Sequence, residues 1–332
     1  MNSVVKSRRW YDGGSHAFNP VVALCLMAAI VFPWLANFFD QSFYISLTSR
    51  IMIYALAATS LNLLLGYGGM ISFGHAAFFG LGGYSVAMLM AGGVHSAWLA
   101  WPVAVAVAAV AAALIGAISL RTKGVYFIMI TLAFAQMLFY LFISMRTYGG
   151  DDGLPLLQRN TVGLNIDLAD DTAFYYVVLV CLSFSLLFVS RLTKSRFGRI
   201  IEGIRENETR MEALGHPVFG YKLACFVIAA AMAGLAGALM VNQTGLASPN
   251  QLYWTQSGML LVMVILGGVG RLYGGVLGAA VLLVLEETLA AYSTHAQLGV
   301  GLVLLAVVFL APAGISGLFK QRSRKECNDS TR

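Results

Sequence analysis

Charged residues are scarce in this chain. They make up 11% of its 332 residues, whereas a soluble domain of similar size has about 25%. Hydrophobic residues account for 59%, and the mean hydropathy is +0.77. These figures exclude an ordinary soluble globular domain and are typical of a protein that crosses a membrane several times.

Catalytic and nucleotide-binding motifs are also absent from the sequence. There is no G-x-x-x-x-G-K-[ST] phosphate-binding loop, so the chain does not bind ATP by that route. The patterns H-E-x-x-H and G-x-S-x-G are missing too. The four cysteines and five histidines are scattered and form neither a disulfide pattern nor a metal-ligand set. We therefore expect no covalent chemistry, cofactor or metal on this chain.

Apolar runs long enough to cross a bilayer dominate what is present. The predicted spans are residues 19–39, 45–65, 74–92, 97–119, 125–145, 173–191, 222–242, 256–271, 274–292 and 296–316. The predicted fold is an all-α, polytopic integral membrane protein with about ten transmembrane helices. Because 66–92 and 256–292 are rich in glycine, we expect broken or re-entrant segments there. The membrane domain is predicted at 19–318, between tails at 1–18 and 319–332.

The basic residues are distributed unequally between the two sides of these spans. With the N-terminus in the cytoplasm, all of the 21 Lys and Arg residues except Arg50, Arg146 and Arg159 fall on the cytoplasmic side. This asymmetry predicts that both termini are cytoplasmic. The same distribution indicates that the net charge of +6 reflects membrane topology and not nucleic-acid binding.

The most polar internal stretch, residues 191–222, lies between two spans and must be an aqueous segment. The apolar residues between Phe197 and Ile204 fall on one helical face. Asn207 is placed to cap a second short helix at 208–214, which Gly215 and Pro217 would end. Glu206 precedes Arg210 by four residues, as in a helical ion pair.

Two interpretations of this cytoplasmic segment remain. It could be a loop whose positive charge only fixes the topology. Alternatively, it could be a folded docking surface for a partner in the cytoplasm. The alternating acidic residues, the apolar face and the helix stop signals favour the docking surface, because a topology loop needs none of them.

On the outer side, residues 146–172 form one substantial loop, in which Asp151 and Asp152 lie within a glycine-rich turn. This loop is either a solvated acidic connection or a landing site for an extracytoplasmic partner. The sequence leaves both readings open.

Two glycine-rich stretches, 66–80 and 266–279, interrupt the hydrophobic pattern. Small residues recur every four positions from 270 to 278 and from 230 to 238, a spacing that lets helices approach closely in lipid. Between 66 and 75 the glycines are too dense for an ordinary helix. An interrupted helix there could line a water-filled path, where free N–H groups suit a substrate carboxylate.

A few polar side chains lie within the spans, and such residues suggest a function. Glu286 and Glu287 lie toward the outer end of the ninth span; either could take part in transport or reach the interface. His75 could contact substrate or be a satisfied structural residue, and Asn62 could bridge two helices. The candidates for a translocation path are Asn62, Gly66, Gly68, Gly69, Ser72, Gly74, His75 and Glu286.

Several of these stretches carry a family resemblance. LNLLLGYGGMISFGHAAFFGLGGYSVAML (61–89), GGDDGL (149–154), SRFGRIIEGIRENETRMEALG (195–215), YKLACFVIAAAMAGLAGAL (221–239), the segment around 248–249 and LGGVGRLYGGVLGA (266–279) are similar to permease subunits of branched-chain amino-acid ABC importers. The resemblance is to the LivM-type member of the permease pair and covers roughly 45–316.

The resemblance implies a permease subunit in a bacterial inner membrane that imports branched-chain amino acids or related small amino or carboxylic acids. It implies as partners a second homologous permease, two cytoplasmic ATPase subunits that bind ATP and magnesium, and an extracytoplasmic solute-binding protein. Residues 192–221 would then couple the permease to the ATPase. The coupling candidates are Arg199, Glu202, Arg205, Glu206, Asn207, Glu208, Arg210, Leu214 and Gly215, and the candidates for docking the binding protein are Asp151 and Asp152.

Other functions compete with this one. A permease of the same family that imports urea or short amides would share these motifs. An ion-coupled secondary transporter would need no ATPase, but usually has more carboxylates near the membrane midplane than this sequence has. An intramembrane enzyme that uses His75 with Glu286 or Glu287 would leave the folded cytoplasmic segment unexplained.

Overall fold

The computed structural model describes residues 20–38, 42–156, 158–163, 168–292, 296–310 and 314. The chain forms two units, residues 1–42 and 43–332. The first unit holds α1 (Pro20–Phe38) and the first residue of α2. The tails predicted at 1–18 and 319–332 lie outside the described residues.

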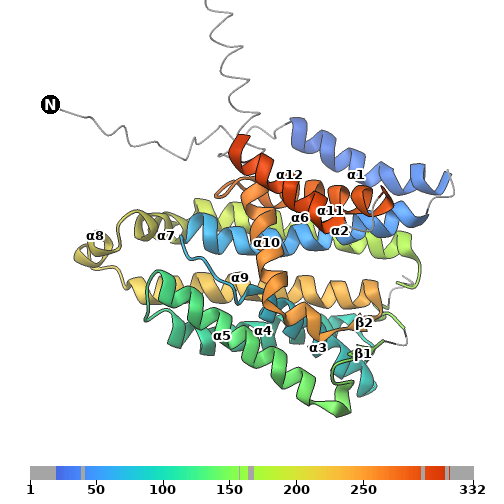
Figure 1. The fold of residues 1–332 in the computed structure, drawn as a ribbon, viewed down its shortest axis with the longest axis horizontal. Helices are drawn as coiled ribbons and strands as arrows, with labels where there is room; N and C mark the ends of the chain where they lie inside the picture. The colour runs from blue at the N-terminus through green and yellow to red at the C-terminus, as the bar shows by residue number, and fades with distance from the viewer. Residues whose placement is uncertain are drawn as a thin grey trace, which may run out of the picture. The chain divides into compact units, whose positions relative to one another are not determined.

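Long apolar helices make up most of the second unit (Figure 1). They are α2 (Ser42–Asn62), α3 (His75–Ala91), α4 (Ala97–Ser119), α5 (Val125–Ser144), α6 (Asp171–Lys194), α9 (Val218–Thr244), α10 (Trp254–Gly267), α11 (Gly274–Tyr292) and α12 (Ala296–Leu310). Shorter elements join them: η1 (Leu63–Tyr67), η2 (Arg146–Tyr148), α7 (Arg196–Glu206), α8 (Glu208–Ala213), η3 (Pro249–Leu252), and the strands β1 (Leu154–Pro155) and β2 (Leu246–Ala247).

Each of the ten predicted spans coincides with a helix in the described part of the chain. Among the residues that the structure describes, six helical stretches are long and apolar enough to cross a membrane; they begin at residues 42, 97, 125, 171, 218 and 274. The prediction of an all-α polytopic membrane protein is confirmed, while the number of crossings stays a prediction. Within the segment predicted at 192–221, α6 continues to Lys194 and α9 begins at Val218, so both ends of the segment are helical.

Helix α9 packs against α3 and α4, and this three-helix group holds much of the buried core (Figure 1). A β-carbon on Gly82 of α3 would lie 2.0 Å from the carbonyl oxygen of Gly234 on α9. One on Gly237 would lie 1.7 Å from the carbonyl oxygen of Phe79. The small-residue repeat at 230–238 therefore lies where the backbones of α9 and α3 approach closely, as its spacing predicts.

We predict that Gly237→Ala strongly destabilises this packing. The added methyl group would meet the backbone of α3, and backbone cannot rotate away as a side chain can. We expect a loss of about 2 kcal/mol or more, measured as a lower thermal midpoint of the detergent-solubilised protein. Gly220→Ala on the same helix is the matched control, because a β-carbon there meets nothing within 4 Å. Equal midpoints for the two variants would contradict the prediction.

Helix α10 crosses from α3 and α5 to α11 and α12 (Figure 1). A β-carbon on Gly278 of α11 would lie 1.7 Å from the carbonyl oxygen of Met263 on α10. A β-carbon on Gly275 would lie 2.8 Å from the backbone nitrogen of Thr59 on α2. The predicted repeat at 270–278 is wrong at its first member, because Gly270 lies in the turn between α10 and α11 with φ of +76°.

Candidate functional site

The interruption predicted between the second and third spans is present. Helix α2 ends in the π-helical turn η1, and seven residues without regular helix precede α3. The N–H groups of Gly68, Gly69 and Met70 donate to carbonyl oxygens of η1, at 3.1–3.2 Å. Single π-helical turns are frequent at functional sites. Gly69 and Ile71 are exposed, while Gly68 and Ser72 are buried.

The start of α3 is closed by the protein's own side chains. Nε2 of the fully buried His75 lies 2.8 Å from Oγ of Ser60. The N–H of Ala76 donates to Oγ of Ser257 on α10, at 2.9 Å. A β-carbon on Gly74 would lie 2.8 Å from the carbonyl oxygen of Thr131 on α5. Because the N–H of Ala76 is already bonded, it is not free for a substrate carboxylate, and these contacts suit the structural reading of His75.

Asn62 joins the two glycine-rich stretches. Its Oδ1 accepts from the N–H of Gly270 at 2.9 Å, and its Nδ2 donates to the carbonyl oxygen of Arg271 at 2.7 Å. The Asn62 side chain is 1% exposed. Gly66 lies so close to this turn that a β-carbon on it would be 2.5 Å from the nitrogen of Gly270. The break after α2 and the turn after α10 are thus one packed junction.

Arg205 of α7 reaches the same junction from the predicted coupling segment. Its guanidinium group donates to the carbonyl oxygen of Gly66. Its side chain also passes over Gly69, where an added β-carbon would lie 2.8 Å from Cγ of Arg205. A residue predicted to act in coupling therefore contacts two residues predicted to line a path.

Glu208 connects the segment to two further helices. Its carboxylate lies 3.1 Å from Nζ of Lys123, just before α5, and 2.9 Å from Nζ of Lys222 on α9. Burial by itself raises the pKa of Glu208, but the hydrogen bonds and charges of the two lysines outweigh it and hold the pKa below its ordinary value. These three groups, with Gly69 and Arg205, help to line a cavity of about 250 Å³.

The segment itself is folded largely as its local signals predict. Helix α7 buries Ile201 and Ile204. The Asn207 side chain caps α8 by accepting from the N–H of Arg210, at 2.9 Å. Gly215 adopts φ of +83°, and its N–H and that of the next residue donate to carbonyl oxygens of the last turn. This is the Schellman arrangement that a C-terminal glycine favours.

The predicted ion pair between Glu206 and Arg210 is wrong. Asn207 has φ of −157° and ψ of 101°, so it ends α7 and starts α8. The two residues lie on different helices, and among the described residues neither takes part in an ion pair within 4.0 Å.

The remaining coupling candidates face outward. Arg199, Glu206 and Arg210 are exposed, Glu202 is half-buried, and the apolar side chain of Leu214 is 67% exposed. A surface that mixes charges with one exposed leucine suits protein docking better than lipid contact.

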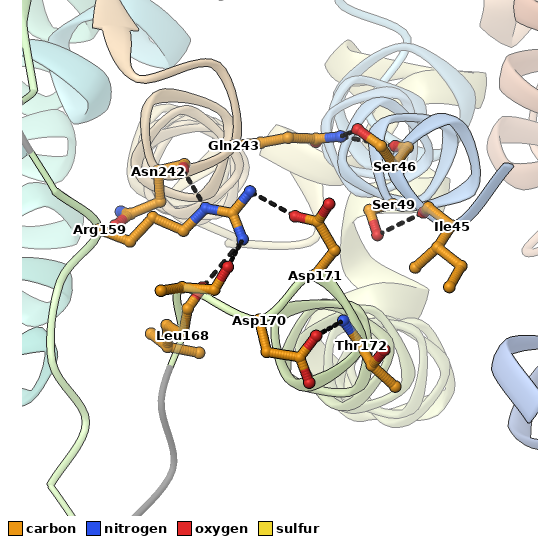
Figure 2. A network of polar contacts seen from close by, with 11 residues as sticks. Ile45, Ser46, Ser49, Arg159, Leu168, Asp170, Asp171, Thr172, Asn242 and Gln243 are labelled. Atoms are coloured by element: carbon orange, nitrogen blue, oxygen red, sulfur yellow. Dashed lines mark hydrogen bonds and ion pairs between the residues drawn. The ribbon is translucent and has the colours of Figure 1, made fainter. Parts of the chain in front are cut away.

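At the other end of the second unit, Arg159 holds the predicted outer loop to the helices. Its guanidinium group donates to the carbonyl oxygens of Asn242 at 3.1 Å and Leu168 at 2.9 Å, and pairs with the Asp171 carboxylate at 2.6 Å. It also lies over the ring of Phe174, 4.9 Å from the centroid. Figure 2 shows this group between the ends of α9 and α6. The sequence offered no local signal for this role, since the partners lie up to 83 residues away.

The glycine-rich turn of the outer loop is also ordered. Gly149 and Gly153 have positive φ and pack so closely that a β-carbon on Gly149 would lie 1.9 Å from the carbonyl oxygen of Gly153. The turn leads into β1, which pairs antiparallel with β2. Asp151 and Asp152 are exposed at its tip. The structure thus presents both carboxylates on a fixed turn.

Comparison with known proteins identifies the family. A family model described as "Branched-chain amino acid transport system / permease component" matches residues 43–312. The chain belongs to this permease family. The match begins at residue 43, the second residue of α2, and therefore does not include α1. No solved structure gives a significant match to this permease.

Individual relatives agree with the family. The permease is 28% identical to the high-affinity branched-chain amino acid transport system permease protein LivM of Escherichia coli, over 92% of this chain and 76% of the relative. It is also 28% identical to LivM of Salmonella typhimurium, over 88% and 74%. The corresponding LivH protein of Salmonella typhimurium is 28% identical over 80% and 91%. The intramembrane-enzyme interpretation has no support in this family.

We predict that Glu208→Gln loosens the cytoplasmic segment of the permease. The change removes both lysine contacts, of which the one to the largely buried Lys222 should matter more. We expect a loss of about 1 kcal/mol, measured as faster limited proteolysis within residues 195–217. Glu212→Gln is the matched control, since Glu212 is exposed on the same helix. Similar cleavage rates for both variants would contradict the prediction.

The pH dependence follows from the lowered pKa of Glu208. Because the folded pKa lies below the ordinary value of 4.5, these ion pairs contribute fully above that pH. Their contribution is lost as the pH falls through the folded value. The rates of limited proteolysis of Glu208→Gln and of the unaltered permease should therefore differ at neutral pH and become equal in acid.

Proposed function

We propose that this permease is one of two homologous membrane subunits of an ATP-driven importer for branched-chain amino acids in a bacterial inner membrane. Two ATPase subunits would bind on the cytoplasmic side, and a solute-binding protein would dock on the outer side. The names of the LivM and LivH relatives support the substrate class. They give no support to the urea or short-amide alternative.

The observation that carries this proposal is the bond between Arg205 and Gly66. It joins a folded, polar segment outside the spans to the break between α2 and α3. Glu208 adds links to α9 and to the residues before α5. Movement of α7 and α8 would therefore be transmitted to several spans at once. Such a connection suits a permease that is driven by a separate ATPase.

The arrangement of the loops agrees with the proposed orientation. Arg205 and Arg271, which the charge asymmetry assigns to the cytoplasm, lie at the junction of Gly66 with Gly270. Lys123 and Lys222, assigned to the same side, line one cavity with Arg205. Arg159 belongs to a separate network with Asp171 at the start of α6 and Asn242 near the end of α9 (Figure 2). In this proposal Leu214 and its charged neighbours contact the ATPase, and Asp151 and Asp152 contact the binding protein.

The proposal is tested by reconstituting the permease with its partner subunits in proteoliposomes. We expect leucine uptake that requires both ATP and the loaded binding protein. Uptake that proceeds without ATP but collapses with an uncoupler would overturn the proposal in favour of an ion-coupled carrier. Cysteines introduced at 152 and 208 report the orientation: an impermeant reagent should label only the first in intact cells.

A further inference from the structure

The cavity that Gly69 and Arg205 help to line carries an excess of positive charge. Its basic residues are Lys123, Arg205 and Lys222. Its one acidic residue, among the described residues that line it, is Glu208. The formal charge of the lining is therefore +2, three positive charges less one negative charge. Such a charge beside a cavity of about 250 Å³ favours an anionic ligand.

The basic side chains have donors beyond the contacts that the protein itself takes. The Glu208 carboxylate takes one contact from Nζ of each lysine, at 3.1 and 2.9 Å, and the carbonyl oxygen of Gly66 takes one from Arg205. An ammonium group has three N–H donors, and a guanidinium group has five. The side chain of Lys222 is 16% exposed and that of Lys123 is 70% exposed. Donors for an anion are therefore present both in an enclosed position and in an open one.

Apolar side chains form much of the remaining wall. Leu120 contributes from the end of α4, Phe127 and Ile128 from α5, and Met70 and Ile71 from the break after α2. A small hydrated anion gains nothing from such a surface. A phospholipid does, because its apolar chains lie directly beside its phosphate group. The mixed lining therefore favours a lipid headgroup over a soluble anion.

An exposed apolar strip on α5 continues from this wall. Gly124 and Ile128 line the cavity, and the neighbouring side chains of Val125, Tyr126 and Met129 are 64%, 76% and 59% exposed. Helix α5 is long and apolar enough to cross a membrane. Tyrosines at the ends of such helices typically lie at the level of the lipid headgroups. An acyl chain could therefore follow α5 while its headgroup occupies the cavity.

The cavity lies where several membrane helices begin or end. Its lining includes Leu120 just after α4, the first turn of α5, and Lys222 in the second turn of α9. Basic pockets between helices on the cytoplasmic side bind anionic headgroups, and anionic lipids give the cytoplasmic leaflet its negative surface potential. In the proposed orientation of the permease, the cavity faces that leaflet.

We propose that this cavity binds the headgroup of one anionic phospholipid of the cytoplasmic leaflet. Lys123 and Lys222 bind the phosphate group, and an acyl chain lies along Val125 and Met129 of α5. The choice of leaflet rests on the proposed orientation, but the class of ligand does not depend on the transported solute. Because the same cavity is lined by α7, α8 and the start of α5, the bound lipid links the cytoplasmic segment to the spans.

The test counts lipids bound to the permease, purified with its partner subunits, by native mass spectrometry in detergent. The probes are dioleoylphosphatidylglycerol, which is anionic, and dioleoylphosphatidylcholine, which is neutral overall. We expect one phosphatidylglycerol site whose affinity exceeds that for phosphatidylcholine by about thirty-fold, since each net positive charge contributes about five-fold. Lys123→Gln and Lys222→Gln should each lower the phosphatidylglycerol affinity by about five-fold, and Lys123→Arg should preserve it. Arg121→Gln is the matched control, because Arg121 is exposed on the same turn but does not line the cavity.

Several results would overturn the inference. Equal affinity for the two lipids would do so, and so would an equal loss in Arg121→Gln, which would indicate attraction to the whole surface. Where Lys222→Gln fails to assemble, Ile128→Trp fills the cavity without changing its charge and should lower the phosphatidylglycerol affinity by about five-fold or more; an unchanged affinity would count against the site. Displacement of the lipid by an equal concentration of glycerol 3-phosphate would identify a soluble phosphate ester as the ligand instead. If the lipid binds as expected but leucine uptake fails, the proposed function fails and this inference stands.

Discussion

An Arg205→Ala permease should assemble normally and yet lose solute-stimulated ATP hydrolysis and uptake. This arginine of α7 bonds to the break after α2, through the carbonyl oxygen of Gly66. A hydrogen bond from a charged group is worth about 1.5–3 kcal/mol, so we expect uptake to fall by about ten- to a hundred-fold. Assembly should survive, because Ile201 and Ile204 still anchor α7.

The measurement compares uptake, stimulated ATP hydrolysis and ATPase co-purification for the variant and the unaltered protein. Arg199→Ala is the matched control, because Arg199 lies on the same helix, is exposed and takes part in no ion pair within 4.0 Å among the described residues. It should affect docking of the ATPase at most, and not the step after docking. Full uptake by Arg205→Ala would mean that the segment does not act through Gly66.

Arg159→Met should disrupt the opposite end of the permease. The methionine keeps the length and apolar packing of the side chain but removes every hydrogen bond to Asn242, Leu168 and Asp171. Because the Arg159 side chain is only 20% exposed and its loss leaves buried carbonyl oxygens without a donor, we expect a loss of about 3 kcal/mol. The thermal midpoint should fall, and stimulation by the binding protein should weaken more than basal ATP hydrolysis.

The control for this second prediction is Arg146→Met. Arg146 lies in the same outer loop but is exposed and forms no ion pair among the described residues. Its replacement should leave both the thermal midpoint and the stimulation unchanged. The same thermal midpoint in the two variants would mean that Arg159 does not hold the loop.

The sequence alone determined the features that depend on near neighbours. The apolar runs placed a helix at every predicted span. The caps of α8 followed from Asn207 and Gly215, because capping bonds join residues only three to five positions apart. The error at Glu206 and Arg210 came from weighing a helical spacing above the cap that separates them. Both signals were local, and the cap is the stronger one.

Tertiary structure alone decided which residues meet across the bundle. Arg205 reaches Gly66 over 139 residues of sequence, and Asn62 reaches Gly270 over 208. Such contacts depend on how each helix is rotated and how closely two backbones approach, which no short-range pattern specifies. Glycines at 66, 82 and 237 permit the approach, but the sequence does not say which helix fills the space.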